Sequence, residues 1–176
     1  MIPWKLIDSA PTPGSGPDLF LFERDNEFSI KSGSYELMNS RVYGTEDALG
    51  RIGCEKITHN PKARVLIGGL GMGYTLRSAL NELGMEAQVA VAELIPEVVK
   101  WNREILAHLA GRPLEDKRVA VHEADVAHMI KSAKADYNAI LLDVDNGPHG
   151  LTITENDWLY SHDGLTAAFG ALRPNG

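Results

Sequence analysis

Beyond residue 60, short apolar runs alternate with longer segments in which apolar residues recur at helical spacing. Short apolar runs bounded by turn residues are typical of buried strands, and a recurrence about every three or four residues is typical of helices. The predicted strands are residues 64–67, 88–92, 118–122 and 137–142. The predicted helices are residues 74–83, 96–109, 126–133 and 165–172. This alternation predicts an α/β fold of the Rossmann-like type with a mostly parallel sheet.

The first 60 residues have a different pattern, in which short apolar segments are separated by turn residues. The predicted strands are residues 19–24, 27–30 and 35–38. The first two flank Asp25-Asn26, a pair that favours a tight turn, so they predict a β-hairpin. This part of the chain is therefore predicted to form a small β appendage.

A helix is also predicted over residues 45–57, where apolar positions lie close to helical spacing. Gly50 and Gly53 weaken this pattern because glycine has a low helix propensity. The length of 176 residues is enough for one well-buried core and too short for two ordinary domains. We expect an appendage over residues 1–60 and one Rossmann-like domain over residues 61–176.

Composition narrows the class of protein. The net charge of −7 and the pI near 5.3 argue against a nucleic-acid partner, which needs clustered Lys and Arg. The chain contains no apolar run long enough for a membrane span, and its N-terminus lacks the pattern of a signal peptide. The single cysteine, Cys54, excludes an internal disulfide and a cysteine cluster for a metal. These features predict a soluble cytoplasmic protein with no membrane partner and no metal site, and with Cys54 in the core.

The first candidate site is a glycine-rich turn between the strand at residues 64–67 and the helix that follows it. Glycines in such a turn let the backbone approach a ligand and present amide donors at a helix N-terminus. Tyr74 stands where the dinucleotide motif G-x-G-x-x-G needs its third glycine, which disfavours NAD and favours a loop that binds S-adenosylmethionine. A purely structural turn is the alternative. The predicted donor pocket contains Gly69, Gly71, Met72 and Gly73.

Two acidic residues follow the next two strands. Glu93 ends the second strand and can accept hydrogen bonds from both ribose hydroxyls of a nucleoside, or it is a solvated carboxylate at a strand end. Asp125 follows the third strand and can accept from an adenine amino group, cap the next helix, or do both. Together with their neighbours Leu94 and Val126, they are predicted to bind the nucleoside.

Asp143 and Asp145 follow the fourth strand, at the edge of the sheet where open α/β folds bind ligands. A carboxylate there can accept a proton from an attacking amine or hold a cationic substrate. Two acids close together also raise one another's pKa, which favours a base that works near neutral pH. The alternative is a simple turn, because residues 145–148 read Asp-Asn-Gly-Pro. His149 is a candidate proton carrier or an exposed loop residue without a role.

The order of these elements resembles the spermidine synthase branch of the S-adenosylmethionine-dependent methyltransferase superfamily. The resemblance is carried by Asn60-Pro61-Lys62, the glycine turn with Leu76-Arg77, Ala92-Glu93-Leu94, Glu123-Ala124-Asp125, Leu142-Asp143 and residues 171–176. It implies a Rossmann-like methyltransferase fold and a transferase of polyamine biosynthesis. It also implies that Glu93 holds the ribose, Asp125 holds the adenine, and Asp143 assists deprotonation of the attacking amine. The implied donor is decarboxylated S-adenosylmethionine or S-adenosylmethionine, and the implied partner is a small amine, with a homodimer left open.

The sequence also departs from that family. Members that make spermidine have Gly-Gly-Gly-Asp-Gly-Gly in the turn, and Met72 stands where their Asp contacts the aminopropyl end of the donor. Their Asp-Ser-Ser-Asp corresponds to Asp-Val-Asp-Asn at residues 143–146, which displaces the second acid, and residues 44–48 stand roughly where they have a Tyr-His-Glu segment that helps to grip the polyamine. Folds of this class normally continue beyond the position of Gly176 with further strands. We expect those strands to be missing here, and without them the fourth strand is predicted to be a sheet edge.

Three hypotheses follow from these matches and departures. The first is a spermidine synthase-like transferase that uses decarboxylated S-adenosylmethionine or S-adenosylmethionine and passes an aminopropyl or methyl group to an amine acceptor. The second is a methyltransferase on the same fold, which Met72 favours. The third is a nucleoside-binding protein without turnover, which the altered polyamine segments favour.

Overall fold

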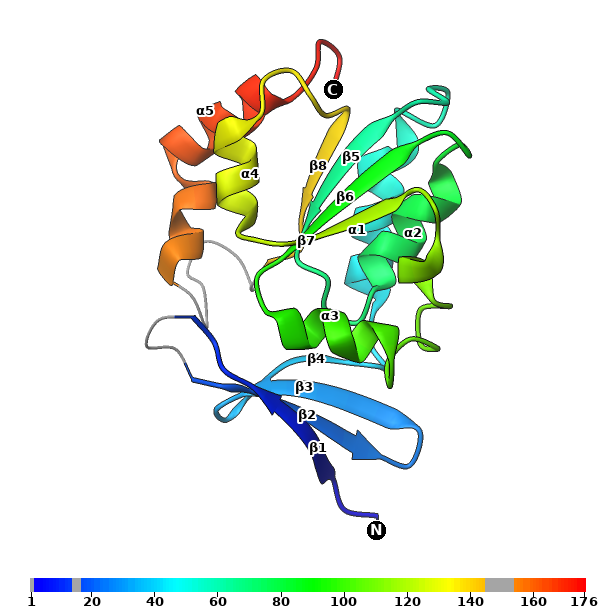
Figure 1. Cartoon of the computed structure of the whole chain (residues 1–176), viewed down its shortest axis with the longest axis vertical. Helices are drawn as coiled ribbons and strands as arrows, with labels where there is room; N and C mark the ends of the chain where they lie inside the picture. Colours follow the sequence, from blue (N-terminus) through cyan, green and yellow to red (C-terminus); the bar gives the residue numbers. More distant parts are fainter. Residues whose placement is uncertain (1, 14–16, 145–153) are drawn as a thin grey trace.

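A computed structural model describes residues 2–13, 17–144 and 154–176 of the chain, and the described part contains two four-stranded sheets (Figure 1). The N-terminal sheet is antiparallel and has the strand order β1-β2-β3-β4. Its strands are β1 (Lys5–Ala10), β2 (Leu19–Arg24), β3 (Glu27–Ser32) and β4 (Tyr35–Asn39).

The predicted hairpin and the predicted third strand of the appendage are confirmed. Arg24 pairs with Glu27 across the turn, and Asp25 has a left-handed backbone with φ of 58°, which Asp tolerates better than most residues. Strand β1 was not predicted. It lies at the edge of the sheet, and most of its residues are exposed or half-buried, so its sequence lacks a clear alternation of apolar and polar positions.

The second sheet is parallel and has the strand order β7-β6-β5-β8. Its strands are β5 (Arg64–Gly68), β6 (Gln88–Glu93), β7 (Val119–Glu123) and β8 (Ala139–Leu142). The helices are α1 (Gly44–Glu55), α2 (Tyr74–Glu82), α3 (Pro96–Arg103), α4 (Val126–Ser132) and α5 (His162–Ala171), with the short 3-10 helices η1 (Pro113–Glu115) and η2 (Thr154–Tyr160). The predicted α/β fold is confirmed, and β8 is an edge strand of the described sheet.

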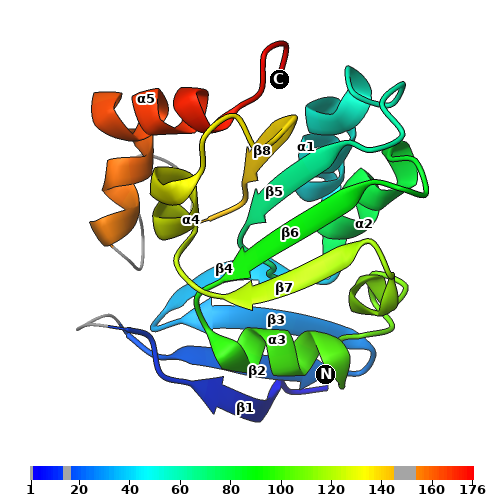
Figure 2. The same cartoon turned by 45° about the horizontal axis from the view of Figure 1, so that its top comes forward.

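Side-chain alternation along β5 divides the core into two layers. Val65 and Ile67 are buried with Leu76 of α2, whereas Leu66 is buried with Ile130 of α4 on the opposite face of the sheet. Figure 2 shows α4 and α5 on one side of this sheet and α1 and α2 on the other. Because helices cover both faces, the strand is apolar at successive positions rather than at every second one.

The predicted helix over residues 96–109 is shorter in the structure. Helix α3 ends at Arg103, because Glu104 leaves the helical region with φ of −114° and ψ of −100°. Leu106 and Ala110 are nevertheless buried in the turns that follow. The helical spacing of these apolar residues therefore reflects burial of a turn against the core, not a continuation of the helix.

Among the residues that the structure describes, no helix is both long and apolar enough to cross a membrane. The same residues contain no group of three or more His, Cys, Asp or Glu side chains placed to hold a metal ion. Cys54 lies in the core, as expected, and burial raises the pKa of its thiol to about 11.

Helix α1 approaches its neighbours through the two glycines that weaken its helical pattern. A Cβ atom on Gly50 would lie 2.6 Å from the Cβ of Ser78 and 2.6 Å from the main-chain oxygen of Thr75, both in α2. A Cβ atom on Gly53 would lie 3.0 Å from the side chain of Leu141 in β8. Both glycines therefore lower the helix propensity of α1 but allow close packing against α2 and β8.

We predict that Gly50→Ala destabilises the protein by about 1 to 3 kcal/mol, because the added methyl group must push α1 away from α2. Gly170→Ala is a matched control, since Gly170 also lies in a helix but a Cβ atom there would meet nothing within 4 Å. The control should be neutral or up to about 1 kcal/mol more stable than the wild type. Urea denaturation measures both changes, and equal effects of the two substitutions would contradict close packing at Gly50.

Candidate active site

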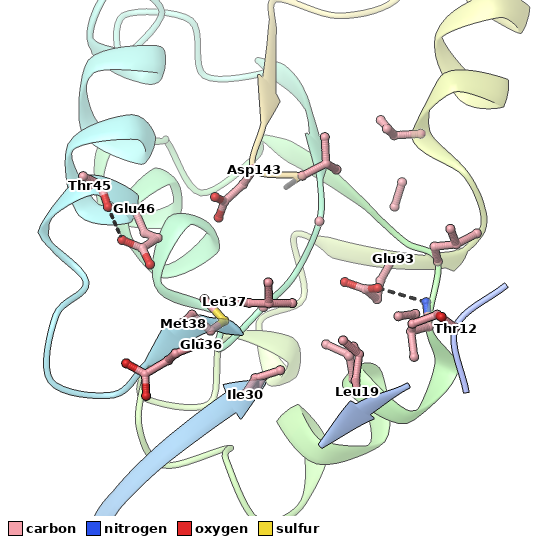
Figure 3. Close-up of a pocket in the computed structure, with 18 of the residues that line it drawn as sticks. Thr12, Leu19, Ile30, Glu36, Leu37, Met38, Thr45, Glu46, Glu93 and Asp143 are labelled. Atoms are coloured by element: carbon pink, nitrogen blue, oxygen red, sulfur yellow. Dashed lines mark hydrogen bonds between the residues drawn. The ribbon is translucent and has the colours of Figure 1, made fainter. Parts of the chain in front are cut away.

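A cavity of about 400 Å³ lies between the N-terminal sheet and the carboxyl ends of the parallel strands (Figure 3). Leu19, Ile30 and Leu37 line it from the N-terminal sheet. The glycine turn and the residues that follow β6, β7 and β8 line it from the parallel sheet. The volume is within the range of roughly 300 to 1,000 Å³ that small-molecule sites occupy. The cavity is therefore a candidate ligand site that both sheets form together.

The glycine turn lies against other parts of the chain without space for side chains. Gly69 and Gly71 line the cavity and have left-handed φ angles of 86° and 52°. A Cβ atom on Gly69 would clash with the main-chain oxygen of Asp143, and one on Gly71 would lie 2.6 Å from the terminal methyl group of Met38. Gly73 is not a lining residue and forms the N-cap of α2 with φ of 82°. The left-handed backbone angles favour glycine at residues 69 and 71, and at Gly69 the main chain of Asp143 also leaves no space for a side chain.

Glu93 joins the glycine turn to the end of β6. Its Oε2 atom accepts a hydrogen bond from the Leu70 amide, and its Oε1 atom accepts one from the Ile95 amide, each at 2.9 Å. Only 8% of the residue is exposed, and this burial raises the pKa of the carboxyl group against the effect of the amide donors. Glu93 is thus a buried carboxylate that two backbone amides hold on the cavity wall, and not a solvated one. Leu94 lines the same wall.

Asp125 caps a helix and also lines the cavity. One of its carboxylate oxygens accepts a hydrogen bond from the Ala127 amide at 2.8 Å, which confirms the predicted N-cap of α4. Asp125 and its neighbour Val126 both line the cavity. The structure therefore places the acids that follow β6 and β7 around one space, as the strand order of a parallel sheet requires.

Asp143 follows β8 and lines the cavity opposite Glu93 (Figure 3). Its Oδ2 atom accepts a hydrogen bond from the Thr75 hydroxyl at 2.7 Å. Burial raises the pKa of Asp143, the negative charge of Glu46 raises it further, and the bond from Thr75 lowers it. A carboxylate with a raised pKa takes up a proton more readily than an ordinary one.

Two further carboxylates line the cavity and were not singled out from the sequence. Glu36 of β4 accepts hydrogen bonds from the Ser29 hydroxyl at 2.6 Å and the Asn39 amide at 2.9 Å, and the first of these mainly holds its pKa below the ordinary value. Glu46 lies in the first turn of α1. Its segment, residues 44–48, stands roughly where the resembled family has a Tyr-His-Glu segment, and this alignment is the signal in the sequence that could have indicated Glu46. Nothing in the sequence pattern indicates Glu36.

The ionisable side chains that line the cavity within the described part of the chain are all carboxylates. They are Glu36, Glu46, Glu93, Asp125 and Asp143. With no Lys, Arg or His among these described lining residues, the electrostatic potential in the cavity favours a cationic ligand.

Comparison with known proteins identifies the family. The family model for the spermine/spermidine synthase domain matches residues 46–176. The chain belongs to this family. Two solved spermidine synthases share its fold. The protein from Thermotoga maritima has a TM-score of 0.73 and 19% identity, and the match covers 96% of this chain and 54% of that protein. A spermidine synthase in complex with the transition state analogue AdoDATO has a TM-score of 0.72 and 18% identity, and the match covers 96% of this chain and 53% of that protein.

Two curated relatives are polyamine aminopropyltransferases. The protein from Saccharolobus solfataricus is 33% identical over 88 residues, which are 50% of this chain and 29% of that protein. The protein from Prochlorococcus marinus strain MIT 9515 is 29% identical over 100 residues, which are 56% of this chain and 35% of that protein. The matched region therefore spans about a third of these relatives' length.

Family membership makes the position of Met72 informative. Met72 stands where spermidine-forming members have an Asp, but its side chain is completely buried in the core and does not line the cavity. The structure therefore brings Gly69 and Gly71 to the cavity and places Met72 and Gly73 behind its wall. Asp145 and His149 lie outside the described residues.

We predict that Asp143→Asn becomes more stable relative to the wild type as pH rises. Folded wild type holds the Asp143 proton more tightly than the unfolded chain, because burial raises the pKa above the ordinary value of 3.8. The wild type should therefore lose stability as pH rises from that value through the raised pKa, by at most about 1.4 kcal/mol per pH unit. Urea denaturation of both proteins across this range tests the prediction, and a difference that does not change with pH would contradict it.

Proposed function

We propose that the protein is an aminopropyltransferase that uses decarboxylated S-adenosylmethionine as donor and a small amine as acceptor. The observation that carries the proposal is the set of five carboxylates in a cavity whose described wall contains no cationic side chain. The decarboxylated donor has a sulfonium and an ammonium group and no carboxylate. S-adenosylmethionine has an additional carboxylate, which would face like charges without a partner.

The donor fits the cavity residues in the following way. The main chain at Gly69 and Gly71 would lie against the donor, since neither position has a side chain to intervene. The proposed role of Glu93 is to accept from the ribose hydroxyls, and that of Asp125 is to accept from the adenine amino group. Leu94 and Val126 would flank the nucleoside. These roles rest on family membership and on the shared position of the residues in one cavity.

Asp143 is the proposed base. Its carboxylate would take a proton from the acceptor ammonium, breaking an N–H bond and leaving a neutral amine with a free lone pair. The donor supplies a carbon bound to the sulfonium, and its C–S bond breaks towards sulfur as the amine nitrogen forms the new C–N bond. Asp143 would then release its proton to solvent. Glu46 and Glu36, on the same side of the cavity as Asp143, would hold positive charge on the acceptor (Figure 3).

Methyl transfer from S-adenosylmethionine is less well supported. It was favoured by Met72 at the position of the aminopropyl-binding acid, but Met72 is buried and away from the cavity wall. Met72 therefore adds no side chain to the donor site, and the negative charge of that site comes from the carboxylates that line the cavity. A cytoplasmic location and a homodimer stay predictions from the sequence.

We predict that decarboxylated S-adenosylmethionine binds with micromolar affinity and at least about tenfold more tightly than S-adenosylmethionine, because only the latter brings a carboxylate into an acidic cavity. Isothermal titration calorimetry of the full-length protein with each donor measures the difference. Glu93→Gln should weaken binding of the decarboxylated donor, while Glu55→Gln on the exposed end of α1 serves as the matched control. Equal or tighter binding of S-adenosylmethionine would contradict the proposed donor.

We predict that Asp143→Asn lowers turnover at least about a hundredfold while donor affinity stays within a few-fold of the wild type, because the amide cannot take up the acceptor proton. Mass spectrometry of small amines incubated with each donor identifies the product. An added aminopropyl group supports the proposal, and an added methyl group would replace it by methyl transfer. Donor binding without any product would indicate a nucleoside-binding protein without turnover.

A further inference from the structure

Three elements meet at the hydroxyl group of Thr75. Thr75 lies in the first turn of α2, directly after the glycine turn, and only 2% of the residue is exposed. Its Oγ1 atom is 2.7 Å from Oδ2 of Asp143 and 3.3 Å from the main-chain oxygen of Glu46. A threonine hydroxyl has one proton to donate, so it can donate to only one of these two acceptors at a time.

The protonation state of Asp143 decides which acceptor the hydroxyl serves. An ionised carboxylate has no proton and is the stronger acceptor, which fits its shorter distance to Thr75. When Oδ1 takes up a proton, Oδ2 becomes a neutral carbonyl oxygen and a weaker acceptor, so the Thr75 hydroxyl can donate to the Glu46 carbonyl instead. The buried Thr75 hydroxyl has an acceptor in either state, and so avoids the cost of an unpaired donor.

We propose that Thr75 is a positioning residue for the base Asp143. Its hydroxyl holds Oδ2 against the protein and leaves Oδ1 to take the proton from the acceptor amine, and it can turn to the Glu46 carbonyl while Oδ1 carries that proton. This inference rests on the proposed aminopropyl transfer, which requires Asp143 to exist in both protonation states during one turnover.

The surroundings of Asp143 make Thr75 important for its charge. From α1, the Glu46 carboxylate acts on Asp143 as a like charge. From the glycine turn, the backbone of Gly69 lies directly against Asp143, and from the N-terminal sheet Glu36 lines the same cavity (Figure 3). Within the described part of the chain, Thr75 is the group that favours ionised Asp143. Its loss would leave burial and like charge unopposed.

The packing of α1 fixes the second acceptor. Because Gly50 has no side chain, α1 and α2 approach closely. A Cβ atom at residue 50 would lie 2.6 Å from the main-chain oxygen of Thr75. The neighbouring Ser78 hydroxyl also donates to the main chain of α1, at Asp47, over 2.7 Å. The contact between the two helices thus holds the Glu46 carbonyl in place beside Thr75.

The test compares Thr75→Val, which has a similar shape and no hydroxyl, with Thr75→Ser, which restores the hydroxyl. The first readout is the pH dependence of kcat in the full-length protein. The second is the pKa of Asp143 from carboxyl 13C NMR, assigned by the signal that Asp143→Asn removes. Thr75→Val should move both the acid limb of the profile and the Asp143 pKa upwards by about one pH unit or more. Thr75→Ser should resemble the wild type.

A lower kcat in Thr75→Val with an unmoved acid limb and an unmoved Asp143 pKa would overturn the inference, because it would show a structural role only. If Thr75→Val does not fold, Thr75→Cys replaces it as a variant of similar size with a weaker donor. The cysteine should move the Asp143 pKa in the same direction by a smaller amount, and no movement would also reject the inference.

The two readouts separate this inference from the proposed function. The NMR measurement needs no turnover, so a raised Asp143 pKa in the variant together with no product from wild type would refute the aminopropyl transfer and support the hydrogen bond. Product formation by wild type together with an unmoved Asp143 pKa in the variant would support the aminopropyl transfer and refute the role of the Thr75 hydrogen bond. Donor affinity measured by calorimetry should be the same in wild type and Thr75→Ser.

Discussion

A buried carboxylate holds the candidate site together. Glu93 accepts hydrogen bonds from the Leu70 amide of the glycine turn and from the Ile95 amide that precedes α3. A second bond, from the Gly69 amide to the Ala92 carbonyl at 2.8 Å, fixes the same turn to β6. Removing a carboxylate from water is costly unless donors satisfy it, and unsatisfied amides would be costly in turn. The glycine turn, the end of β6 and the start of α3 therefore keep their positions together.

The cavity also depends on how the N-terminal sheet attaches to the helices. The Trp101 indole of α3 donates to Oδ2 of Asp8 in β1 at 2.9 Å, and the Tyr74 hydroxyl of α2 donates to the main chain of Ser40 at 3.3 Å. These contacts place the apolar surface of the N-terminal sheet over the carboxyl ends of the parallel strands (Figure 3). Neither sheet encloses the cavity alone, so changes in the appendage alter the site as directly as changes beside the glycine turn.

The sequence predicts the parts of this site that follow from strand order. Glu93, Asp125 and Asp143 each follow a strand, and parallel strands end at one edge, so the convergence of these acids is predictable. Met72 shows the limit, because a turn of successive glycines can direct a residue to the core as easily as to the cavity. Glu36 shows another limit. Its place in the cavity wall depends on how the N-terminal sheet docks against the parallel sheet, and the spacing of apolar residues does not predict that docking.

The charges of the cavity connect binding to stability. Carboxylates that share a partly buried space repel one another, and burial raises the pKa of Asp143 because its charged form lacks sufficient compensation. A cationic ligand supplies the missing charge, so part of its binding free energy is the relief of a cost that the ligand-free protein bears. In the proposed reaction, an amine that has lost its proton to Asp143 no longer supplies that charge. The same acidic wall that favours a cation therefore opposes its deprotonation, and a base with a raised pKa reconciles the two requirements.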